Sequence, residues 1–443
     1  MVSKVGANKG RAQLVAVVAA LTLICGAQAA LAQVAGGFGQ SYTDDTISLL
    51  SPHPMERQHS PAPIREYAGL PLEGWMLYPS LFLGGIYDDN ILQTSIDRKR
   101  AAGFRLGPGL LAERKSGVHK TTVYAMGDIR LYPGETSANA PNAQIGFIHD
   151  WEPQRDFTLR AQGGYAHLTN VSNSGFVTTP TGGTAIIVSP QHYDTISGSV
   201  SGVKSFDRIF VGLAGTLNGT TYDNLQQSTG SVSQSYRNNI VYDASGRLGY
   251  AVSSALYAFS QAEGNITSFN DSIYDSHGYR LVSGLGSDRL GLFRGEIYAG
   301  YQRQFYEQQS ASGGSPVYGG KLIWSPTPAW TVNASLDETY QSSALALAGN
   351  TSGGPAHVTA ALVGISYAMS KSWSASVRGG YSDAVYIVGG RVDHQLTSGV
   401  TFNYTVLRNL LLTFDYTFFD VISTAPSASF VRNQFTLGTT YKY

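Results

Sequence analysis

The chain of 443 residues contains one cysteine, Cys25, which lies in an N-terminal segment that we expect to be removed. A mature chain without cysteine has no structural disulfide, no thiolate metal ligand and no thiol nucleophile. The absence of thiols therefore excludes a disulfide-stabilised scaffold and cysteine-based catalysis.

Charged residues are also scarce. They make up 14% of the chain, and the 30 basic and 30 acidic residues cancel to a formal net charge of zero. Soluble domains carry roughly 25% charged residues, and a nucleic-acid-binding protein usually shows a basic excess. The balance predicts no nucleic-acid partner, and together with 51 glycines and 27 tyrosines it favours strands that meet water on one face only.

Long apolar segments are missing after residue 32. A transmembrane helix needs about 20 consecutive apolar residues, and no later segment reaches that length. Open sheets cannot cross a bilayer, because their edges would leave backbone groups unpaired in lipid. If the mature chain spans a membrane, it must do so as a closed β-barrel.

The first 32 residues have the three parts of a secretory signal peptide. Lys4, Lys9 and Arg11 form a basic region, residues 14–24 are apolar, and an Ala-Leu-Ala sequence precedes Gln33. We therefore expect export of the chain and cleavage before Gln33.

Residues 33–73 are rich in proline and have few periodic apolar positions. Proline lacks the backbone donor that a sheet needs, so this segment is predicted to be a periplasmic extension. His53 and His59 are interpreted as linker residues and not as metal ligands.

Residues 74–443 show repeated alternation of apolar and polar residues. In 434–443, Phe435, Leu437 and Tyr441 alternate with polar residues, and the segments 157–166, 240–250, 373–382 and 410–418 alternate in the same way. Period-2 alternation is typical of strands with one lipid-facing and one wet face. The pattern predicts an all-β, transmembrane, antiparallel up-and-down barrel.

The connections between these segments alternate between short and long. Short connections fall near 152–156, 205–208 and 408–409, whereas long ones fall near 88–100, 169–191 and 341–355. Outer-membrane barrels have short periplasmic turns and long outer loops. We predict about 18 strands, with 16 as the alternative, and an even number places both termini on the periplasmic side of the outer membrane.

Aromatic residues near the predicted strand ends are candidates for the two interfacial girdles. They are Tyr87, Tyr132, Trp151, Phe157, Trp324, Trp330, Trp373 and Phe419. The final strand also ends on an aromatic, which resembles the closing strand of bacterial outer-membrane barrels. That resemblance implies an assembly signal, read by the barrel-assembly machinery, at Phe435, Tyr441 and Tyr443.

Assigning faces strand by strand places many charged residues in the lumen, because a charge on the lipid face costs about 2–4 kcal/mol at mid-depth. They could line an open pore or form ion pairs that brace the wall. The predicted pore-lining residues are Arg105, Arg130, Arg160, Arg237, Arg247, Arg280, Arg294, Glu296, Lys321, Asp337, Arg378, Arg391, Asp393 and Asp415. Glu113, Asp128, Asp243 and Lys442 are expected on the same face.

The sequence shows no catalytic motif. The nine histidines are dispersed, and none lies in a Gly-x-Ser-x-Gly or His-Glu-x-x-His phrase. Asp88, Asp89 and Asn90 could supply oxygen ligands to calcium, but the same residues are favoured in turns and the EF-hand spacing is absent. We predict no enzymatic activity, no metal site and no cofactor.

The phrase L-F-L-G-G-I-Y-D-D-N-I at residues 81–91 and the phrase F-R-L-G-P-G-L at residues 104–110 resemble the first two strands of one family. It comprises outer-membrane β-barrel porins found with bacterial exopolysaccharide clusters. The resemblance implies a channel in contact with outer-membrane lipids, which could conduct exopolysaccharide or other saccharides together with periplasmic polysaccharide-export components. The alternative is a structural or surface-interaction barrel without significant transport.

Overall fold

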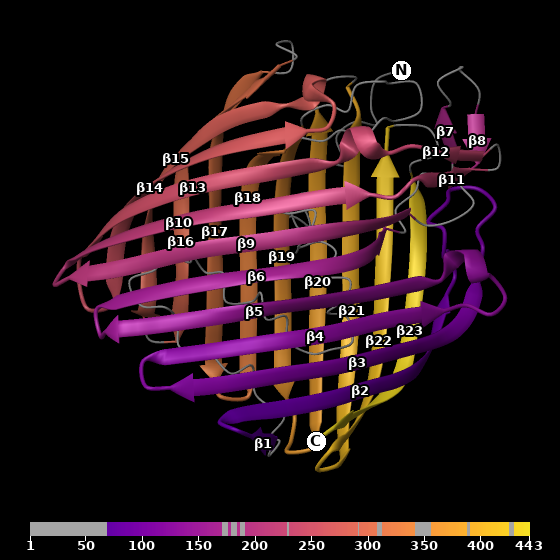
Figure 1. Ribbon diagram of the computed structural model, residues 1–443, viewed down its shortest axis with the longest axis horizontal. Coiled ribbons are helices and arrows are strands. Elements are labelled where there is room, and N and C mark those ends of the chain that lie inside the picture. The colour runs from indigo at the N-terminus through magenta and orange to yellow at the C-terminus, as the bar shows by residue number, and fades with distance from the viewer. Residues whose placement is uncertain are drawn as a thin grey trace, which may run out of the picture.

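The computed structural model describes residues 69–170, 176–178, 184–186, 191–227, 230–290, 292–307, 312–341, 356–387, 390–424 and 429–443. Eighteen antiparallel strands close into one barrel (Figure 1). Within these residues no helix is long and apolar enough to cross a membrane. The predicted signal peptide and all but the last residues of the predicted extension lie outside the described residues.

The barrel strands are β2 (Trp75–Asp88), β3 (Ala101–Ser116), β4 (His119–Leu131), β5 (Ala140–Gln154), β6 (Phe157–Asn170), β9 (Gln191–Phe206), β10 (Ile209–Tyr222), β13 (Asn239–Ala251), β14 (Leu256–Phe269), β15 (Ser276–Leu290), β16 (Phe293–Tyr306), β17 (Gly313–Thr327), β18 (Trp330–Gln341), β19 (Ala356–Ala368), β20 (Trp373–Tyr386), β21 (Val392–Leu407), β22 (Leu410–Ser423) and β23 (Phe430–Lys442). The short strand β1 (Leu70–Leu72) pairs with the start of β2. Two small hairpins, β7 (Phe176–Thr178) with β8 (Thr184–Ile186) and β11 (Leu225–Gln227) with β12 (Gly230–Val232), and the 3-10 turns η1 (Thr136–Ala138), η2 (Ser235–Arg237) and η3 (Ser272–Tyr274) belong to the loops.

The barrel closes where the first of these strands meets the last. β2 pairs antiparallel with β23, from Ser80 opposite Lys442 to Asp88 opposite Gln434. The count of 18 strands is confirmed over the alternative of 16. Because the strand number is even, β2 begins and β23 ends at the same rim, where β1 and the C-terminus lie close together in Figure 1.

The connections differ between the two rims. At the short-turn rim, tight turns such as 117–118, 155–156 and 207–208 join the strands, whereas the long-loop rim has connections such as 89–100 and 223–238. The structure therefore has the alternation of loop lengths that the sequence predicts. The turn 117–118 and the connection between β20 and β21 are not predicted from the sequence pattern.

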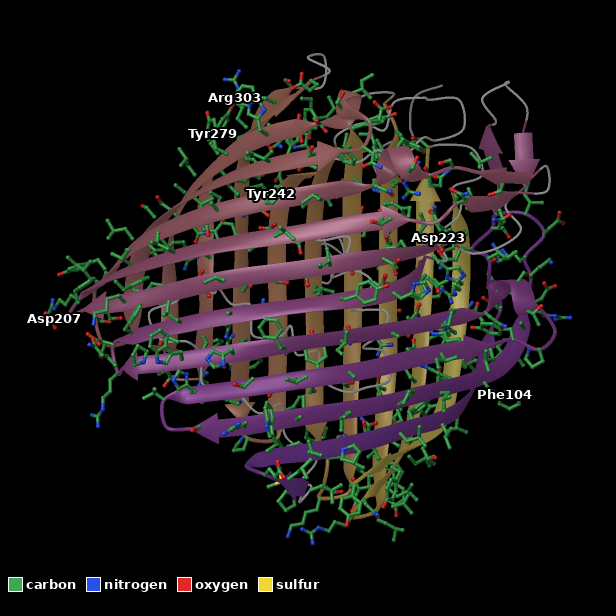
Figure 2. The ribbon with its side chains drawn as sticks, viewed as in Figure 1. Phe104, Asp207, Asp223, Tyr242, Tyr279 and Arg303 are labelled. Carbon is green, nitrogen blue, oxygen red and sulfur yellow. The ribbon has the colours of Figure 1, made fainter. Side chains whose placement is uncertain are left out.

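Side chains alternate between the two faces of the wall, apart from register shifts near the strand ends. The large exposed apolar side chains, among them Leu213, Ile297 and Leu437, share one face, and the buried charged residues share the other. Figure 2 shows Phe104, Tyr242 and Tyr279 projecting outward from the ribbon. Apolar residues on the outer face suit lipid, and the polar inner face suits water.

Aromatic residues gather on the outer face at the short-turn rim, in cross-strand stacks. The ring centroids of Trp330 and Tyr367 are 4.1 Å apart, and those of Trp373 and Tyr404 are 4.4 Å apart. Trp151, Phe157 and Trp324 face the same way, and Tyr87 faces outward at the other rim. Aromatic girdles of this kind mark membrane–water interfaces.

Two residues predicted for the girdles lie elsewhere. Tyr132 is 3% exposed and packs under the first loops with Ile86 and Ile91. Phe419 stands opposite Arg432 on the inner face, with the guanidinium 5.7 Å from its ring. The girdle prediction was wrong for both, because nearness to a strand end does not determine which face a residue takes.

Candidate functional site: the inner face of the barrel

The predicted pore-lining residues reach the lumen side from many strands. Cross-strand neighbours share a face, and the registers place on the inner face Arg105, Arg130, Arg160, Arg247, Arg280, Arg294, Glu296, Lys321, Asp337, Arg378, Asp393 and Asp415. Arg391 precedes β21, and Arg237 ends η2 in the loop before β13. The contacts of these residues show which of them form ion pairs with other residues of the wall.

The first charged cluster lies on β3 and β4. Arg105 and Arg130 are directly opposite each other, and Asp128, which is 0% exposed, accepts from both. Nε of Arg105 is 2.5 Å from Oδ1 of Asp128, and Nη2 of Arg130 is 2.7 Å from Oδ2. One carboxylate thus separates two buried guanidiniums, neither of which can lose its proton.

The second cluster joins β20 to β22. Arg378 donates two hydrogen bonds to Asp415, of 2.9 and 3.0 Å. Thr401 on β21 donates to the same carboxylate at 2.6 Å. This bidentate geometry is the strong form of an arginine–carboxylate pair, and it connects three strands.

The third cluster lies on β13, β14 and β16. Nη1 of Arg247 is 2.8 Å from Oε1 of Glu296, and the hydroxyl of Tyr257 donates to that same oxygen at 2.6 Å. The Arg247 guanidinium also lies 4.0 Å from the centroid of Phe259. Lys321 stands opposite Glu296 on β17.

Arg280 extends this cluster toward β18. It pairs with Asp337 at 3.1 Å and with Glu263 at 3.7 Å. The hydroxyl of Tyr298 donates to Asp337. Side chains from β14, β15, β16 and β18 are thereby linked on one part of the inner wall.

The other predicted residues differ in their partners. Arg160 pairs with Asp150, and Arg391 with Asp393, each at 2.6 Å. Arg237 donates to Gln191 at 2.8 Å and lies over the ring of Tyr222. In the described part of the chain, Arg294 has no ion pair. The contacts favour the wall-bracing interpretation for most of these charges and leave Arg294 available to solutes.

A group that the sequence did not assign to a function joins the two ends of the barrel. The carboxylate of Asp88 accepts two hydrogen bonds from Arg432, at 2.8 and 2.5 Å, and both side chains are buried. Asp89 accepts from the backbone N–H and the side-chain amide of Asn433, each at 2.6 Å. We call Asp88, Asp89, Asn90, Arg432 and Asn433 the closing clasp.

Asn90 completes the closing clasp. Its side-chain amide donates to the carbonyl of Val431 at 3.0 Å and to that of Thr94 at 2.8 Å. Within the described residues no group of three or more His, Cys, Asp or Glu could hold a metal ion. The Asp-Asp-Asn phrase makes hydrogen bonds across the closing seam. Its signal in the sequence is the cluster of turn-forming residues at a strand end.

The three residues of the predicted assembly signal face outward. Phe435, Tyr441 and Tyr443 are all exposed, and the ring of Phe435 lies 4.8 Å from that of Tyr416. The backbone N–H of Tyr443 donates to Pro79 at 3.2 Å, which is the last bond of the closing seam. Their recognition by the assembly machinery stays a prediction.

We expect Tyr443→Asp to lower the amount of protein in the outer membrane several-fold, because it removes the terminal aromatic. The matched control is Tyr250→Asp, which puts the same charge on an outward tyrosine near the same rim. Immunoblots of outer-membrane fractions measure both. Equal levels of the two variants would show that the terminal aromatic carries no signal.

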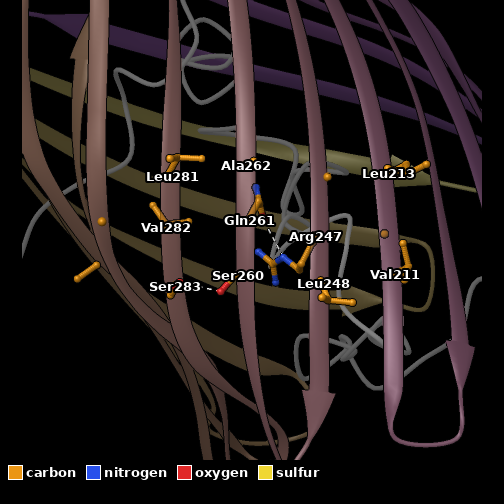
Figure 3. A pocket seen from close by; sticks show the side chains of 14 residues that line it. Val211, Leu213, Arg247, Leu248, Ser260, Gln261, Ala262, Leu281, Val282 and Ser283 are labelled. Atoms are coloured by element: carbon orange, nitrogen blue, oxygen red, sulfur yellow. Dashed lines mark hydrogen bonds between the residues drawn. The ribbon is translucent and has the colours of Figure 1, made fainter.

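One hollow of about 500 Å³ lies in the wall between β10 and β16. Figure 3 shows Leu213, Leu248 and Leu281 around it, with Arg247 hydrogen-bonded to Gln261 between them. Small residues, including Gly212, Gly246 and Gly300, thin the wall here. The Arg247–Gln261 bond, of 2.6 Å, closes the wall on the lumen side.

All histidines within the described residues face outward near strand ends. His119 and His149 lie at the short-turn rim, and His167, His192, His277, His357 and His394 at the long-loop rim. His167 and His394 each contact an aspartate, Asp194 at 2.8 Å and Asp383 at 3.1 Å. None of these described histidines reaches the inner face.

Solved structures with a similar outline are receptors and transporters. The siderophore receptor PirA from Pseudomonas aeruginosa has 8% identity and a TM-score of 0.41, with 83% of this chain and 80% of that chain covered. The FrpB iron transporter from Neisseria meningitidis has 8% identity and a TM-score of 0.44, with 85% and 82% covered. At this level of likeness these structures carry no argument about the function of the chain.

A comparison with curated proteins gives no match. A family model does match, over residues 62–443, which includes every strand of the barrel. Together with the closed barrel and its apolar outer face, that match places the protein among the β-barrel porins of the outer membrane. The chain belongs to the family described as "Putative beta-barrel porin 2".

Proposed function

We propose that the protein is a passive channel for hydrophilic solutes across the outer membrane. The observation that carries this proposal is a closed barrel of 18 strands with a polar inner face. Barrels of 8 strands are filled by their own side chains, whereas barrels of 16–18 strands leave an aqueous channel. Membership in a porin family supports the same function.

The proposal includes an orientation and partners. Short turns face the periplasm in outer-membrane barrels, so the short-turn rim, and with it both termini, would be periplasmic. Outer-membrane lipids would cover the apolar face, and the barrel-assembly machinery would insert the chain. The solutes we propose are saccharides, including exopolysaccharide delivered by periplasmic export components.

The porin family also supports a non-enzymatic role. A barrel that only supports the envelope or binds a surface partner remains the competing function, and ion conductance separates the two. A transport function requires an open lumen, whereas a purely structural barrel does not.

The test is single-channel recording of the purified, full-length protein in a planar bilayer. We expect stable conductance and a reversal potential close to zero in a salt gradient, because most inner arginines pair with inner carboxylates. Faster gel migration of the unboiled protein controls for folding of the barrel. A folded protein without conductance would contradict the channel and favour the structural barrel.

A further inference from the structure

One sector of the inner wall carries several uncharged polar groups on neighbouring strands. Side-chain hydrogen-bond partners are absent for Gln162 on β6, Ser197 and Ser199 on β9 and Asn218 on β10, counting only described residues. All four are partly exposed. The charged groups of the lumen, in contrast, are largely satisfied by one another.

The registers place these side chains in two adjacent rows. Tyr124, Gly146, Gly164, Ser197 and Asn218 are successive cross-strand partners from β4 to β10. Neighbouring strands are about 4.8 Å apart, so this row spans roughly 20 Å around the wall.

The second row lies two residues away along each strand, on the same face. It runs through Thr122, Ile148, Gln162, Ser199 and Thr216. Rows two residues apart are separated by about 6.7 Å, so Gln162, Ser197, Ser199 and Asn218 form a continuous patch. We call these four residues and the neighbouring Tyr124 the neutral track.

Tyr124 gives the neutral track an aromatic surface. Its hydroxyl lies 2.5 Å from the position that a Cβ on Gly146 would take, and 3.5 Å from the corresponding position on Gly164. The two glycines therefore leave room for the tyrosine to extend over them on the inner face of the wall. A flat aromatic beside amide and hydroxyl groups offers an apolar surface and hydrogen bonds together.

Two buried hydroxyl residues extend the same wall. Thr195 and Ser201 on β9 are each 5% exposed, lie on the inner face, and have no side-chain hydrogen-bond partner within the residues described. Their hydroxyls add two uncharged hydrogen-bonding groups at the ends of the β9 part of the neutral track.

We propose that the neutral track binds an uncharged, polyhydroxylated chain, such as a linear neutral oligosaccharide, as it passes through the lumen. This inference rests on the proposed channel and specifies its solute. Hydroxyl groups donate and accept hydrogen bonds, which matches the amide and hydroxyl groups of the neutral track. An acidic chain fits less well, because Arg160 is already paired with Asp150 and Asp243 stands at the end of the second row.

The experiment is titration calorimetry on full-length protein in a polyoxyethylene detergent, which has no sugar headgroup. The probes are maltohexaose as the neutral chain and an oligogalacturonate of similar length as the acidic chain. We expect the wild type to bind maltohexaose more tightly than oligogalacturonate. Gln162→Ala with Ser199→Ala should weaken maltohexaose binding on the order of tenfold, since two hydrogen bonds are lost.

The matched control is Gln395→Ala with Thr397→Ala, which removes an amide and a hydroxyl from the inner face of β21. It should bind maltohexaose as the wild type does. Tyr124→Leu should also weaken binding, and heat-modifiable migration confirms that each variant is folded. Absent maltohexaose binding, preference for the acidic probe, or equal weakening in the control would overturn the proposal. Conductance recorded in parallel shows separately whether the channel function holds.

Discussion

Arg432→Ala should destabilise the barrel by about 3–5 kcal/mol, the usual cost of removing one partner of a buried ion pair. Asp88 is 0% exposed and receives both of its charge-assisted bonds from Arg432. The variant would leave that carboxylate buried and poorly compensated at the closing seam. The readout is the temperature at which the fast-migrating, folded band disappears from a gel of unboiled samples.

The matched control for this prediction is Lys99→Ala. Lys99 pairs with Glu135 at 3.1 Å, but the two side chains are 49% and 31% exposed. Exposed pairs contribute at most about 1 kcal/mol, so the melting temperature should hardly change. A similar drop for both variants would mean that the closing clasp has no special part in stability.

Asp128→Ala should have an effect of comparable size, for a different reason. Arg105 and Arg130 face each other across β3 and β4, and Asp128 is the carboxylate that pairs with both. Without it, two buried guanidiniums would repel each other, and arginine cannot relieve this by losing a proton. We expect loss of more than about 3 kcal/mol in urea unfolding of the barrel in detergent.

This account also predicts an asymmetry that a simple packing defect would not produce. Arg105→Gln alone should cost less than Asp128→Ala, because the Asp128–Arg130 pair stays intact. Adding Arg105→Gln to Asp128→Ala should restore part of the lost stability. If the double variant is as unstable as the sum of the two single variants, like-charge repulsion is not the cause.

The fold could be predicted from the sequence because the two faces of the barrel wall produce an alternation of apolar and polar residues with a period of two. Leu437 and Tyr441 lie on the outer, lipid-compatible face, and Thr436 and Thr440 lie on the polar inner face. Loop lengths then sort the strand ends into two rims. The alternation and the loop lengths do not depend on contacts between distant residues, so both can be recognised in the sequence alone.

The face of a residue was less certain where two similar residues are adjacent. Phe418 and Phe419 are both aromatic, so the local pattern cannot tell which faces lipid, and the register with β23 places Phe419 inside. Tyr132 follows the last residue of β4, where the chain leaves the wall and packs under a loop. The alternation of apolar and polar residues does not predict the position of side chains beyond the end of a strand.

Partners in the lumen could not be predicted from the sequence at all. The contact of Arg247 with Glu296, or of Arg280 with Asp337, depends on strand register and on how far each side chain reaches along the wall. The sequence shows only that these residues share the inner face. Only the three-dimensional structure therefore shows whether a charged residue lines the pore or forms an ion pair that braces the wall.

The closing clasp has a consequence for incomplete or misaligned chains. Asp88 and Arg432 are 344 residues apart in sequence, so the first strand waits for its partner until nearly the whole barrel exists. A chain that stops before Arg432, or that skips a hairpin and misaligns β23, leaves Asp88 and Asp89 as unpaired carboxylates at the edge of an open sheet. The hydrogen bonds of the closing clasp thus form only in a barrel that has all its strands in the correct register.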